Sequence, residues 1–185
     1  DYLYKGVSFC AVCDGSFYKD KNVAMIGYGD QAASAAIYLA GLAKHVTVLT
    51  SKPDVESPIY AEQLMSLDNV EVIGGAQVLS IEGNEYADHI HFRENGGAEK
   101  SLRVDGIFIE GGVPNAVLAE SLGLELDDKG NIAVERPDML THVDGVFAAG
   151  DVTGGLHQIS KAVGEGACAA VSAAIYIKKK YKSKK

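Results

Sequence analysis

The sequence lacks the features that mark several specialised classes of protein. It has no tryptophan, and its longest apolar stretches, 32–43 and 167–177, are shorter than the ~18–20 residues that a bilayer crossing needs. No signal-peptide pattern opens the chain, so we expect a soluble, cytoplasmic protein with no membrane partner. The 185 residues fit one large domain or two small ones. The start at Asp1 rather than Met suggests a processed form or an excised piece.

Basic residues are scarce outside the C-terminus. The chain carries 17 Lys+Arg against 25 Asp+Glu, a formal charge of −8, and six of the lysines lie in the segment 178–185. Removing those six positive charges takes the body of the chain to −14, and a body that acidic repels a phosphate backbone. We therefore expect no nucleic-acid partner, and we interpret the Lys-rich tail as a solvated terminus.

The three cysteines are too few, and odd in number, for a disulfide framework. Cys168 lies in a run of small residues typical of a helix, where we predict a buried and inert side chain. The other two form Cys10-Ala11-Val12-Cys13. Such a pair can close a redox disulfide in which one thiolate attacks, can supply half of a zinc site, or can be structural. The histidines and Cys168 form no second ligand pair at zinc-site spacing, which favours redox exchange.

Asp14 follows the cysteine pair directly. Its carboxyl group could donate or accept the proton that thiol–disulfide exchange requires. An Asp before Gly15 is also common in turns, so the residue alone does not decide between the two roles.

A nucleotide-binding pattern comes next along the chain. The apolar run Val23–Ile26 is typical of a buried parallel strand, the segment 33–43 of a helix, and Val46–Leu49 of a second strand, which completes a βαβ unit. A GxGxxA element joins the first strand to the helix. Its first glycine makes a tight turn, its second lets a pyrophosphate approach backbone N–H groups, and its alanine packs the helix on the strand. The candidate cofactor-binding residues are Gly27, Gly29, Asp30, Gln31 and Ala32, although packing alone can also select such a turn.

The end of the second strand indicates which dinucleotide fits. An NAD site usually offers Asp or Glu there to the ribose diol, whereas this chain has Thr50-Ser51-Lys52. The missing carboxylate argues against strict NAD selectivity. Lys52, together with the hydroxyl of Ser51, could hold a 2′-phosphate, so we include both among the candidate cofactor-binding residues.

Further elements follow on both sides of a predicted domain boundary at 111–115, where Gly112 is another candidate cofactor-binding residue. Before the boundary we predict a helix at Ser57–Leu67, a strand at Val70–Ile73, a β-meander between Gln77 and Phe108, and a buried strand at Gly106–Ile109. Beyond it we predict a short helix near 117–121, a hairpin through Asp127–Gly130, a strand from Val143 to Asp151, and a helix at about Gln158–Ile177. A carboxylate at a strand end before a helix start can bind a cofactor hydroxyl, and helix capping by Asp151 is the alternative.

These elements, in this order, resemble the low-molecular-weight thioredoxin reductase family and the related flavoprotein subunit of alkyl hydroperoxide reductase. Val7–Gly15 is similar to the family's redox-active motif, and Gly145–Asp151 with Gln158 is similar to its C-terminal FAD signature. The resemblance covers about residues 5–177. It implies an α/β fold with three parts: a redox motif and Rossmann-like NAD(P)-binding domain with a β-meander at 1–113, a C-terminal segment of a second, FAD-binding α/β domain at 114–177, and the Lys-rich tail at 178–185.

The resemblance also implies an activity. In this family FAD passes electrons from NADPH to the Cys-x-x-Cys disulfide, which then reduces thioredoxin. By position, Cys10 would be the thiol that attacks the disulfide of a thioredoxin-like partner, Cys13 the thiol that reacts with the flavin, and Asp14 the general acid. Asp151 would contact the ribityl chain or phosphates of FAD. The FAD-binding residues implied are Gly150, Asp151, His157, Gln158 and Ile159, and the complete protein would be a homodimer.

Two departures from the family pattern leave alternatives open. Where the family has His-Arg-Arg and another Arg four residues later, this chain has Thr50-Ser51-Lys52 and Glu56. The electron donor could therefore be NADPH, NADH, or another donor such as ferredoxin or reduced flavin. The family's FAD module, which precedes the cysteine motif, has no counterpart in these 185 residues. A nucleotide-binding or redox-sensing module without turnover is thus the alternative function.

Overall fold

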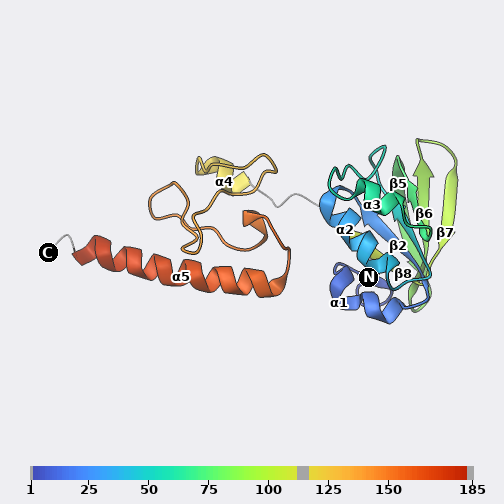
Figure 1. Ribbon diagram of the computed structural model, residues 1–185, viewed down its shortest axis with the longest axis horizontal. Coiled ribbons are helices and arrows are strands. Elements are labelled where there is room, and N and C mark those ends of the chain that lie inside the picture. The colour runs from blue at the N-terminus through green and yellow to red at the C-terminus, as the bar shows by residue number, and fades with distance from the viewer. Residues whose placement is uncertain (1, 112–116, 183–185) are drawn as a thin grey trace. The chain divides into compact units, whose positions relative to one another are not determined.

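The computed structural model describes residues 2–111 and 117–182 (Figure 1). The chain divides into two compact units, Asp1–Gly112 and Val113–Lys185, and each unit is described by itself. No helix among the described residues has the length and apolar character that a membrane crossing requires.

The first unit is built on a five-stranded parallel sheet. Its strands, in spatial order, are β1 (Val7–Ser8), β8 (Gly106–Glu110), β2 (Asn22–Gly27), β3 (His45–Leu49) and β4 (Val70–Ile73). Met25 of β2 lies between Val48 of β3 and Phe108 of β8, and all three side chains are buried. Apolar residues on both faces of a strand favour the centre of a parallel sheet. The strands predicted at Val23–Ile26, Val46–Leu49, Val70–Ile73 and Gly106–Ile109 are confirmed.

Helices cover one face of this sheet and antiparallel strands cover the other (Figure 1). The helical side consists of α1 (Ala11–Asp14), the 3₁₀ helix η1 (Gly15–Tyr18), α2 (Gly29–Ala40) and α3 (Ala61–Met65). α2 begins earlier than predicted because the GxGxxA element forms its first turn. α3 is shorter than the predicted helix, because the Ser57 hydroxyl accepts a hydrogen bond from the N–H of Tyr60 in a turn before the helix.

The antiparallel sheet is the predicted β-meander. It consists of β5 (Ala76–Gly83), β6 (Ala87–Glu94) and β7 (Glu99–Arg103). Ile90 and Phe92 of β6 form a second core with Ala24 and Ile107 of the parallel sheet. Successive residues of a strand point to opposite faces, so β2 contributes Val23 and Met25 to the helical side and Ala24 to this side.

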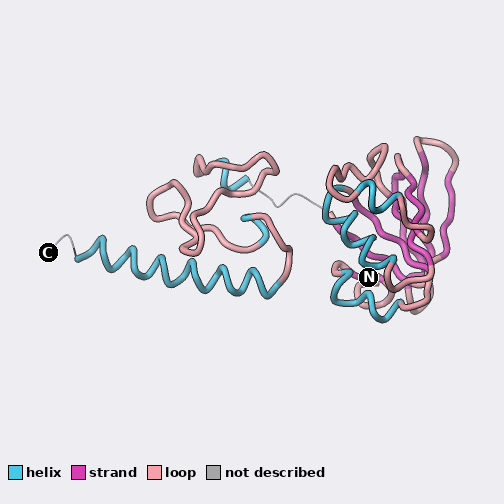
Figure 2. The backbone as a smooth tube through the Cα atoms, viewed as in Figure 1, coloured by secondary structure: helices cyan, strands magenta, loops and turns pink. Residues whose placement is uncertain are grey.

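The second unit is mainly loops and one long helix (Figure 2). Its helical elements are α4 (Val117–Ser121), η2 (Asp151–Thr153, a 3₁₀ turn) and α5 (Ile159–Lys182). The predicted hairpin through Asp127–Gly130 is present as a turn closed by one isolated bridge, Leu126 to Ile132. The Asp127 Oδ1 accepts hydrogen bonds from the N–H groups of Lys129 and Asn131 in this turn. The predicted strand from Val143 to Asp151 is wrong. Only one isolated bridge, Leu140 to Phe147, forms there, since the described residues of this unit supply no neighbouring strand.

α5 differs from the prediction in length and in burial. It continues past Ile177 to Lys182, so the first part of the Lys-rich tail is helical. The predicted burial of Cys168 is also wrong, because its side chain is exposed. Among the described side chains of α5 only Glu165 is buried. A run of small residues therefore predicted the helix here, but it did not predict which face would be covered.

Candidate redox and nucleotide-binding site

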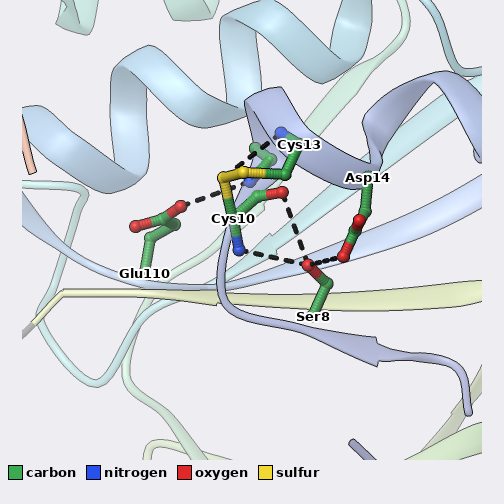
Figure 3. Close-up of a disulfide and its surroundings, with 6 residues drawn as sticks. Ser8, Cys10, Cys13, Asp14 and Glu110 are labelled. Atoms are coloured by element: carbon green, nitrogen blue, oxygen red, sulfur yellow. Dashed lines mark hydrogen bonds between the residues drawn. A yellow bond between two sulfur atoms is a disulfide. The ribbon is translucent and has the colours of Figure 1, made fainter. Parts of the chain in front are cut away.

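Cys10 and Cys13 form a disulfide, and their Cα atoms are 5.3 Å apart (Figure 3). The short strand β1 places them, since Val7 pairs in parallel with Ile107 of β8 and the chain then turns into α1. Cys10 is the N-cap of α1, where its Sγ accepts a hydrogen bond from the N–H of Cys13 at 3.2 Å. Two sulfur atoms bonded to each other are not thiolate ligands, so this arrangement favours the redox interpretation over the zinc alternative.

The zinc alternative would need further ligands from the described part of the chain. Within residues 2–111 and 117–182, no group of three or more His, Cys, Asp or Glu side chains is arranged to hold a metal ion.

Ser8 connects the disulfide to Asp14. Its hydroxyl donates a hydrogen bond to Oδ2 of Asp14 at 2.7 Å and accepts one from the N–H of Cys10 at 3.1 Å. Figure 3 shows the Asp14 carboxylate turned toward Ser8. Sequence reasoning gave Ser8 no role. The available signal was a small polar residue between Val7 and Phe9, beside the cysteine pair.

Tyr18 lies on the side of the site where Asp14 is found. Its ring packs edge-on against Phe108, with centroids 5.2 Å apart. A Cβ on Gly106 would lie 2.2 Å from this ring, so the tyrosine occupies the space that the glycine leaves. Burial, and then the charge of Asp14, raise the pKa of Tyr18 above its usual range. The phenol therefore stays neutral beside the carboxylate.

Glu110, at the end of β8, lies between the disulfide and the nucleotide-binding turn. Its Oε1 accepts a hydrogen bond from the N–H of Ala11 in α1 at 3.4 Å (Figure 3). Its backbone oxygen lies only 1.7 Å from the position that a Cβ on Gly27 would take. Sequence reasoning missed Glu110, because nothing in a local pattern shows that β8 lies between β1 and β2.

The two glycines of the GxGxxA element have different surroundings. Gly27 is packed directly against the backbone of β8, whereas a Cβ on Gly29 would meet nothing within 4 Å. Gly29 has φ +79° and starts α2. Ala32 is fully buried in the core beneath α2. Gly27 and Ala32 thus serve packing, and the open space at Gly29 is where a pyrophosphate could approach the helix N-terminus.

A hollow of about 360 Å³ lies at the carboxyl ends of β2, β3 and β8. Its lining includes Gly27, Tyr28, Ser51, Glu110 and Gly111, together with the first residues of β5. Ligands of open parallel sheets bind at this edge. The structure therefore places Ser51 and the glycine-rich turn around one cavity, as a dinucleotide site requires, whereas Gly112 lies outside the described residues.

Two of the other candidate nucleotide-binding residues, Lys52 and Asp30, interact with residues of the loop after β3. Lys52 forms an ion pair with Glu56 at 3.7 Å and lies over the ring of Tyr28. Asp30 accepts a hydrogen bond from the Ser57 hydroxyl at 2.8 Å. The backbone oxygen of Gln31 accepts one from Ser34, which is internal to α2. The N–H of Gly29 donates to the oxygen of Val55 at 2.6 Å, so this loop already bonds to the start of α2.

In the second unit, a hydrogen-bonded network fixes the segment that begins at Gly150. Glu165 of α5 accepts hydrogen bonds from the N–H of Gly150 at 2.9 Å and from the Thr153 hydroxyl at 2.8 Å. Lys161 donates to the same carboxylate at 3.0 Å, and Arg136 also pairs with it. The loop that starts at Gly150 is thereby fixed to α5. The side chain of Asp151 is exposed, that of Ile159 is 83% exposed, and His157 and Gln158 are partly buried.

Glu165 is the strongly perturbed acid of this network. Burial raises the pKa of Glu165, but the hydrogen bonds from Arg136, Lys161, Gly150 and Thr153 outweigh burial and hold it at about 2. A pKa below that of the unfolded chain means that the network stabilises the unit at neutral pH. That contribution declines below the ordinary Glu value of ~4.3 and is lost as the pH falls toward 2. Sequence reasoning missed Glu165, since its partners are up to 29 residues away.

Three comparisons relate the chain to known proteins. The family model "Pyridine nucleotide-disulphide oxidoreductase" matches residues 1–166. Among curated proteins, the F component of alkyl hydroperoxide reductase from Staphylococcus epidermidis is 38% identical over 179 residues, which cover 95% of this chain and 35% of that protein.

Solved structures of thioredoxin reductases are also similar to this chain. Thioredoxin reductase from Streptococcus pyogenes is 33% identical with a TM-score of 0.78, and the match covers 96% of this chain and 59% of that one. A ferredoxin-flavin thioredoxin reductase from Clostridium acetobutylicum is 34% identical with a TM-score of 0.51, and that match covers 98% and 57%. The chain thus spans about a third of the length of the curated relative and less than two thirds of each solved structure.

Proposed function

The chain belongs to the pyridine nucleotide-disulphide oxidoreductase family, and from that premise we propose that it is the disulfide-carrying part of a thioredoxin-disulfide reductase. The observation that carries the proposal is the Cys10–Cys13 disulfide beside Asp14 and the end of β8. Because the chain spans 35% of the curated relative, turnover is proposed for the complete protein. This chain by itself is proposed to perform dithiol exchange. A redox-sensing module without turnover is the alternative.

Each residue of the disulfide site has a proposed role. Once the disulfide is reduced, the Cys10 thiolate attacks the partner's disulfide and forms a mixed disulfide, while the other partner sulfur leaves with a proton from Asp14. Cys13 then attacks Sγ of Cys10, which restores the Cys10–Cys13 bond and releases the second partner sulfur as a thiol. Cys13 would be the sulfur that faces FAD, and FAD, when bound, would supply the two electrons that reduce this disulfide.

A protein partner has access to this site. Phe9 before the cysteines, Val12 between them and Phe17 after them are 60%, 61% and 72% exposed. Exposed aromatic and apolar side chains in one segment are typical of a protein-binding surface. We propose a thioredoxin-like protein as the partner, and a component of an alkyl hydroperoxide reductase is the alternative that the curated relative suggests.

The number of titratable thiols tests the redox proposal. The oxidised chain is expected to show one thiol, because Cys168 is free and exposed while Cys10 and Cys13 are bonded. After reduction and removal of the reductant, all three cysteines should react. A thiol reagent assay in denaturant measures both states. The variant Cys168→Ser should give none and then two, and an unchanged count on reduction would contradict a redox-active pair.

The GxGxxA turn supports a dinucleotide site. Open space at Gly29 and the hollow lined by Gly27 and Ser51 leave room for a pyrophosphate and ribose. We propose that Gly29, Asp30 and Gln31 present the N-terminus of α2 to the pyrophosphate, and that Lys52 and Ser51 lie beside the adenosine ribose. Nicotinamide nucleotide, when bound there, would be the hydride donor.

Lys52 tests which nucleotide fits. We expect Lys52→Ala to weaken NADPH binding about tenfold, because one charge-assisted contact to a 2′-phosphate is lost, and to leave NADH binding unchanged. Glu56→Gln should strengthen NADPH binding, since it frees Lys52 from its ion pair. Titration calorimetry with both nucleotides measures these effects. Equal losses for NADPH and NADH in Lys52→Ala would rule out the 2′-phosphate role.

A donor other than a pyridine nucleotide is the second candidate. Lys52 already pairs with Glu56, the N–H of Gly29 already donates to Val55, and a ferredoxin-flavin thioredoxin reductase is among the similar structures. The visible spectrum of the purified protein separates the candidates. Bound flavin that bleaches with NADPH or NADH supports the nucleotide-fed enzyme, and bound flavin indifferent to both supports another donor. A colourless protein that binds nucleotide supports the module without turnover.

The second unit is proposed to be the C-terminal segment of the FAD-binding domain. Its proposed FAD contacts are Gly150, Asp151, His157, Gln158 and Ile159. The positive φ of Gly150 and its bond to Glu165 support a fixed loop there, and exposed Asp151 is available to a ligand hydroxyl. The domain limits 1–113, 114–177 and 178–185, the role of Gly112 and the homodimer remain predictions from the resemblance.

A further inference from the structure

We propose that Ser8 is a positioning residue for Asp14: its buried hydroxyl ties the carboxyl group of the proton donor to the backbone of the attacking cysteine. The proposal deepens the proposed function and rests on it, since it takes Asp14 as the acid and Cys10 as the nucleophile. Ser8 is buried and bonds to Asp14 and to the backbone of Cys10, so we place its effect in the orientation of Asp14 and not in direct contact with the reacting atoms.

The geometry of Ser8 fits this role. The residue is 4% exposed, so water cannot easily replace its hydrogen bonds. A serine hydroxyl has one proton to donate and lone pairs to accept. The Ser8 hydroxyl donates a hydrogen bond to Asp14 at 2.7 Å and accepts one from the N–H of Cys10 at 3.1 Å. The short strand β1 pairs with β8 and so fixes the backbone of Ser8. The hydrogen bond from Ser8 therefore fixes the position of the Asp14 carboxylate relative to the sheet.

The hydroxyl also has a second acceptor for its proton. The backbone oxygen of Cys10 lies 3.4 Å from Ser8 Oγ, longer than the 2.7 Å to Asp14. When Asp14 is protonated, its own O–H can donate to Ser8 while the Ser8 proton turns toward Cys10. When Asp14 is ionised, the shorter bond forms. Ser8 can therefore hydrogen-bond to Asp14 in both protonation states of the carboxyl group.

Ser8 acts on one step, the attack of the Cys10 thiolate on a substrate disulfide. The Cys10 thiolate bonds to one sulfur of a disulfide, and the bond between the two substrate sulfurs breaks. The second sulfur takes the electron pair of that bond and receives the proton of the Asp14 carboxyl group. Asp14 is left as a carboxylate, and the Ser8 O–H donates to it. No further oxidant or reductant takes part in this half-reaction.

Other titratable groups face Asp14 and must be separated from it. Tyr18 of η1 is close enough to Asp14 for the charge of that residue to raise the pKa of Tyr18. Tyr38 of α2 packs beside Gly15. Glu110 of β8 contacts the N–H of Ala11, and the two cysteine thiols at α1 titrate once reduced. Glu110 is the other carboxyl group beside the disulfide, so the measurement must distinguish it from Asp14.

The direct test is the protonation midpoint of Asp14, followed through its carboxyl carbon resonance in the oxidised 185-residue chain. The variants are Ser8→Ala, Ser8→Thr and the matched control Ser80→Ala, which removes a half-buried serine bonded to Glu82 at 3.0 Å. Loss of one hydrogen bond to the carboxylate should move the midpoint upward by roughly 0.5–1 pH unit in Ser8→Ala. Ser8→Thr and Ser80→Ala should match the wild type. Glu110→Gln removes the second acidic titration and so assigns the signal.

The kinetic test uses the reduced chain and two small disulfides. Hydroxyethyl disulfide releases an aliphatic thiol that needs a proton as it leaves, whereas an aromatic disulfide releases a stable thiolate that does not. In Ser8→Ala the descending limb of the pH profile for hydroxyethyl disulfide should shift to higher pH by the same amount as the midpoint. The profile for the aromatic disulfide should not shift. Ser8→Thr should restore the wild-type profile.

The outcomes separate this proposal from the proposed function. If Asp14→Asn leaves exchange with hydroxyethyl disulfide unchanged, Asp14 is not the acid and the proposed role of that residue is wrong. If Asp14→Asn slows exchange but Ser8→Ala moves neither the midpoint nor the profile, the role of Ser8 is overturned and that of Asp14 stands. A Ser8→Ala variant that slows both disulfides equally, with an unmoved midpoint, would show a purely structural serine and would also overturn the proposal.

Discussion

Gly27→Ala is expected to lower the stability of the first unit more than an alanine substitution at the other glycine of the nucleotide-binding turn. The new Cβ would lie 1.7 Å from the backbone oxygen of Glu110, and a backbone atom of a central strand cannot move aside without breaking the pairing of β2 with β8. We expect the free energy of unfolding to fall by about 3 kcal/mol or more. The melting temperature should drop by roughly 10–20 °C, as measured by thermal denaturation followed by circular dichroism.

The matched control for Gly27→Ala is Gly29→Ala, two residues along the same turn. A Cβ on Gly29 meets nothing within 4 Å, so its cost is limited to placing a non-glycine residue at φ +79°, about 1–2 kcal/mol. Similar melting temperatures for the two variants would contradict the close packing of β2 on β8. The comparison separates the glycine that the fold requires from the glycine that leaves space for a ligand.

Gly29→Val is expected to abolish nucleotide binding in a chain that remains folded. The branched side chain fills the open space at the start of α2, where a pyrophosphate must approach the backbone within hydrogen-bonding distance. We expect the affinity for the bound nucleotide to fall by at least about 100-fold, which corresponds to ~2.7 kcal/mol. Titration calorimetry measures this loss, and the circular dichroism spectrum verifies that the variant is folded.

Gly96→Val controls for backbone strain. Gly96, in the β6–β7 hairpin, has φ +71° and, like Gly29, has nothing within 4 Å of its added Cβ. Both valine variants should lose a similar amount of stability, whereas only Gly29→Val should lose the nucleotide. Wild-type affinity in Gly29→Val would show that the pyrophosphate does not bind at the N-terminus of α2, and equal affinity losses in both variants would attribute the effect to strain.

Much of the first unit could be predicted because its signals are local. Val23–Ile26 and Val46–Leu49 are short apolar runs on either side of a glycine-rich turn, and the strands formed at those positions. The β-meander was also predictable, because alternation and turn residues lie within a few positions of each other. The Cys-x-x-Cys spacing indicated a disulfide, and the structure contains it.

The contacts around the site could not be predicted, because they join segments far apart in the chain. Ser8 bonds to Asp14 within the same segment, but its burial depends on the pairing of β1 with β8. Glu110 reaches Ala11 across 99 positions. Residue patterns report which strands exist, but they do not report their spatial order, and these contacts follow from the order β1-β8-β2.

The errors in the second unit have a common physical origin. The segment from Val143 to Asp151 has the composition of a strand, yet a strand forms only where another strand supplies hydrogen bonds. The environment of Cys168 likewise depends on what packs against α5, and composition carries no information about it. Composition thus predicted the helix of α5, but it predicted neither the burial of Cys168 nor the pairing of the segment before Gly150.

The pairing of Val7 with Ile107 has a consequence for biosynthesis. The strand before the two cysteines is made 100 residues ahead of its partner strand β8. At ~5–20 residues per second, that interval is roughly 5–20 s. During this time β1 has no β8 to pair with, so the sheet that holds the backbone of Ser8 is incomplete. The burial of Ser8 in the redox site is therefore reached only after the last strand of the sheet has been synthesised.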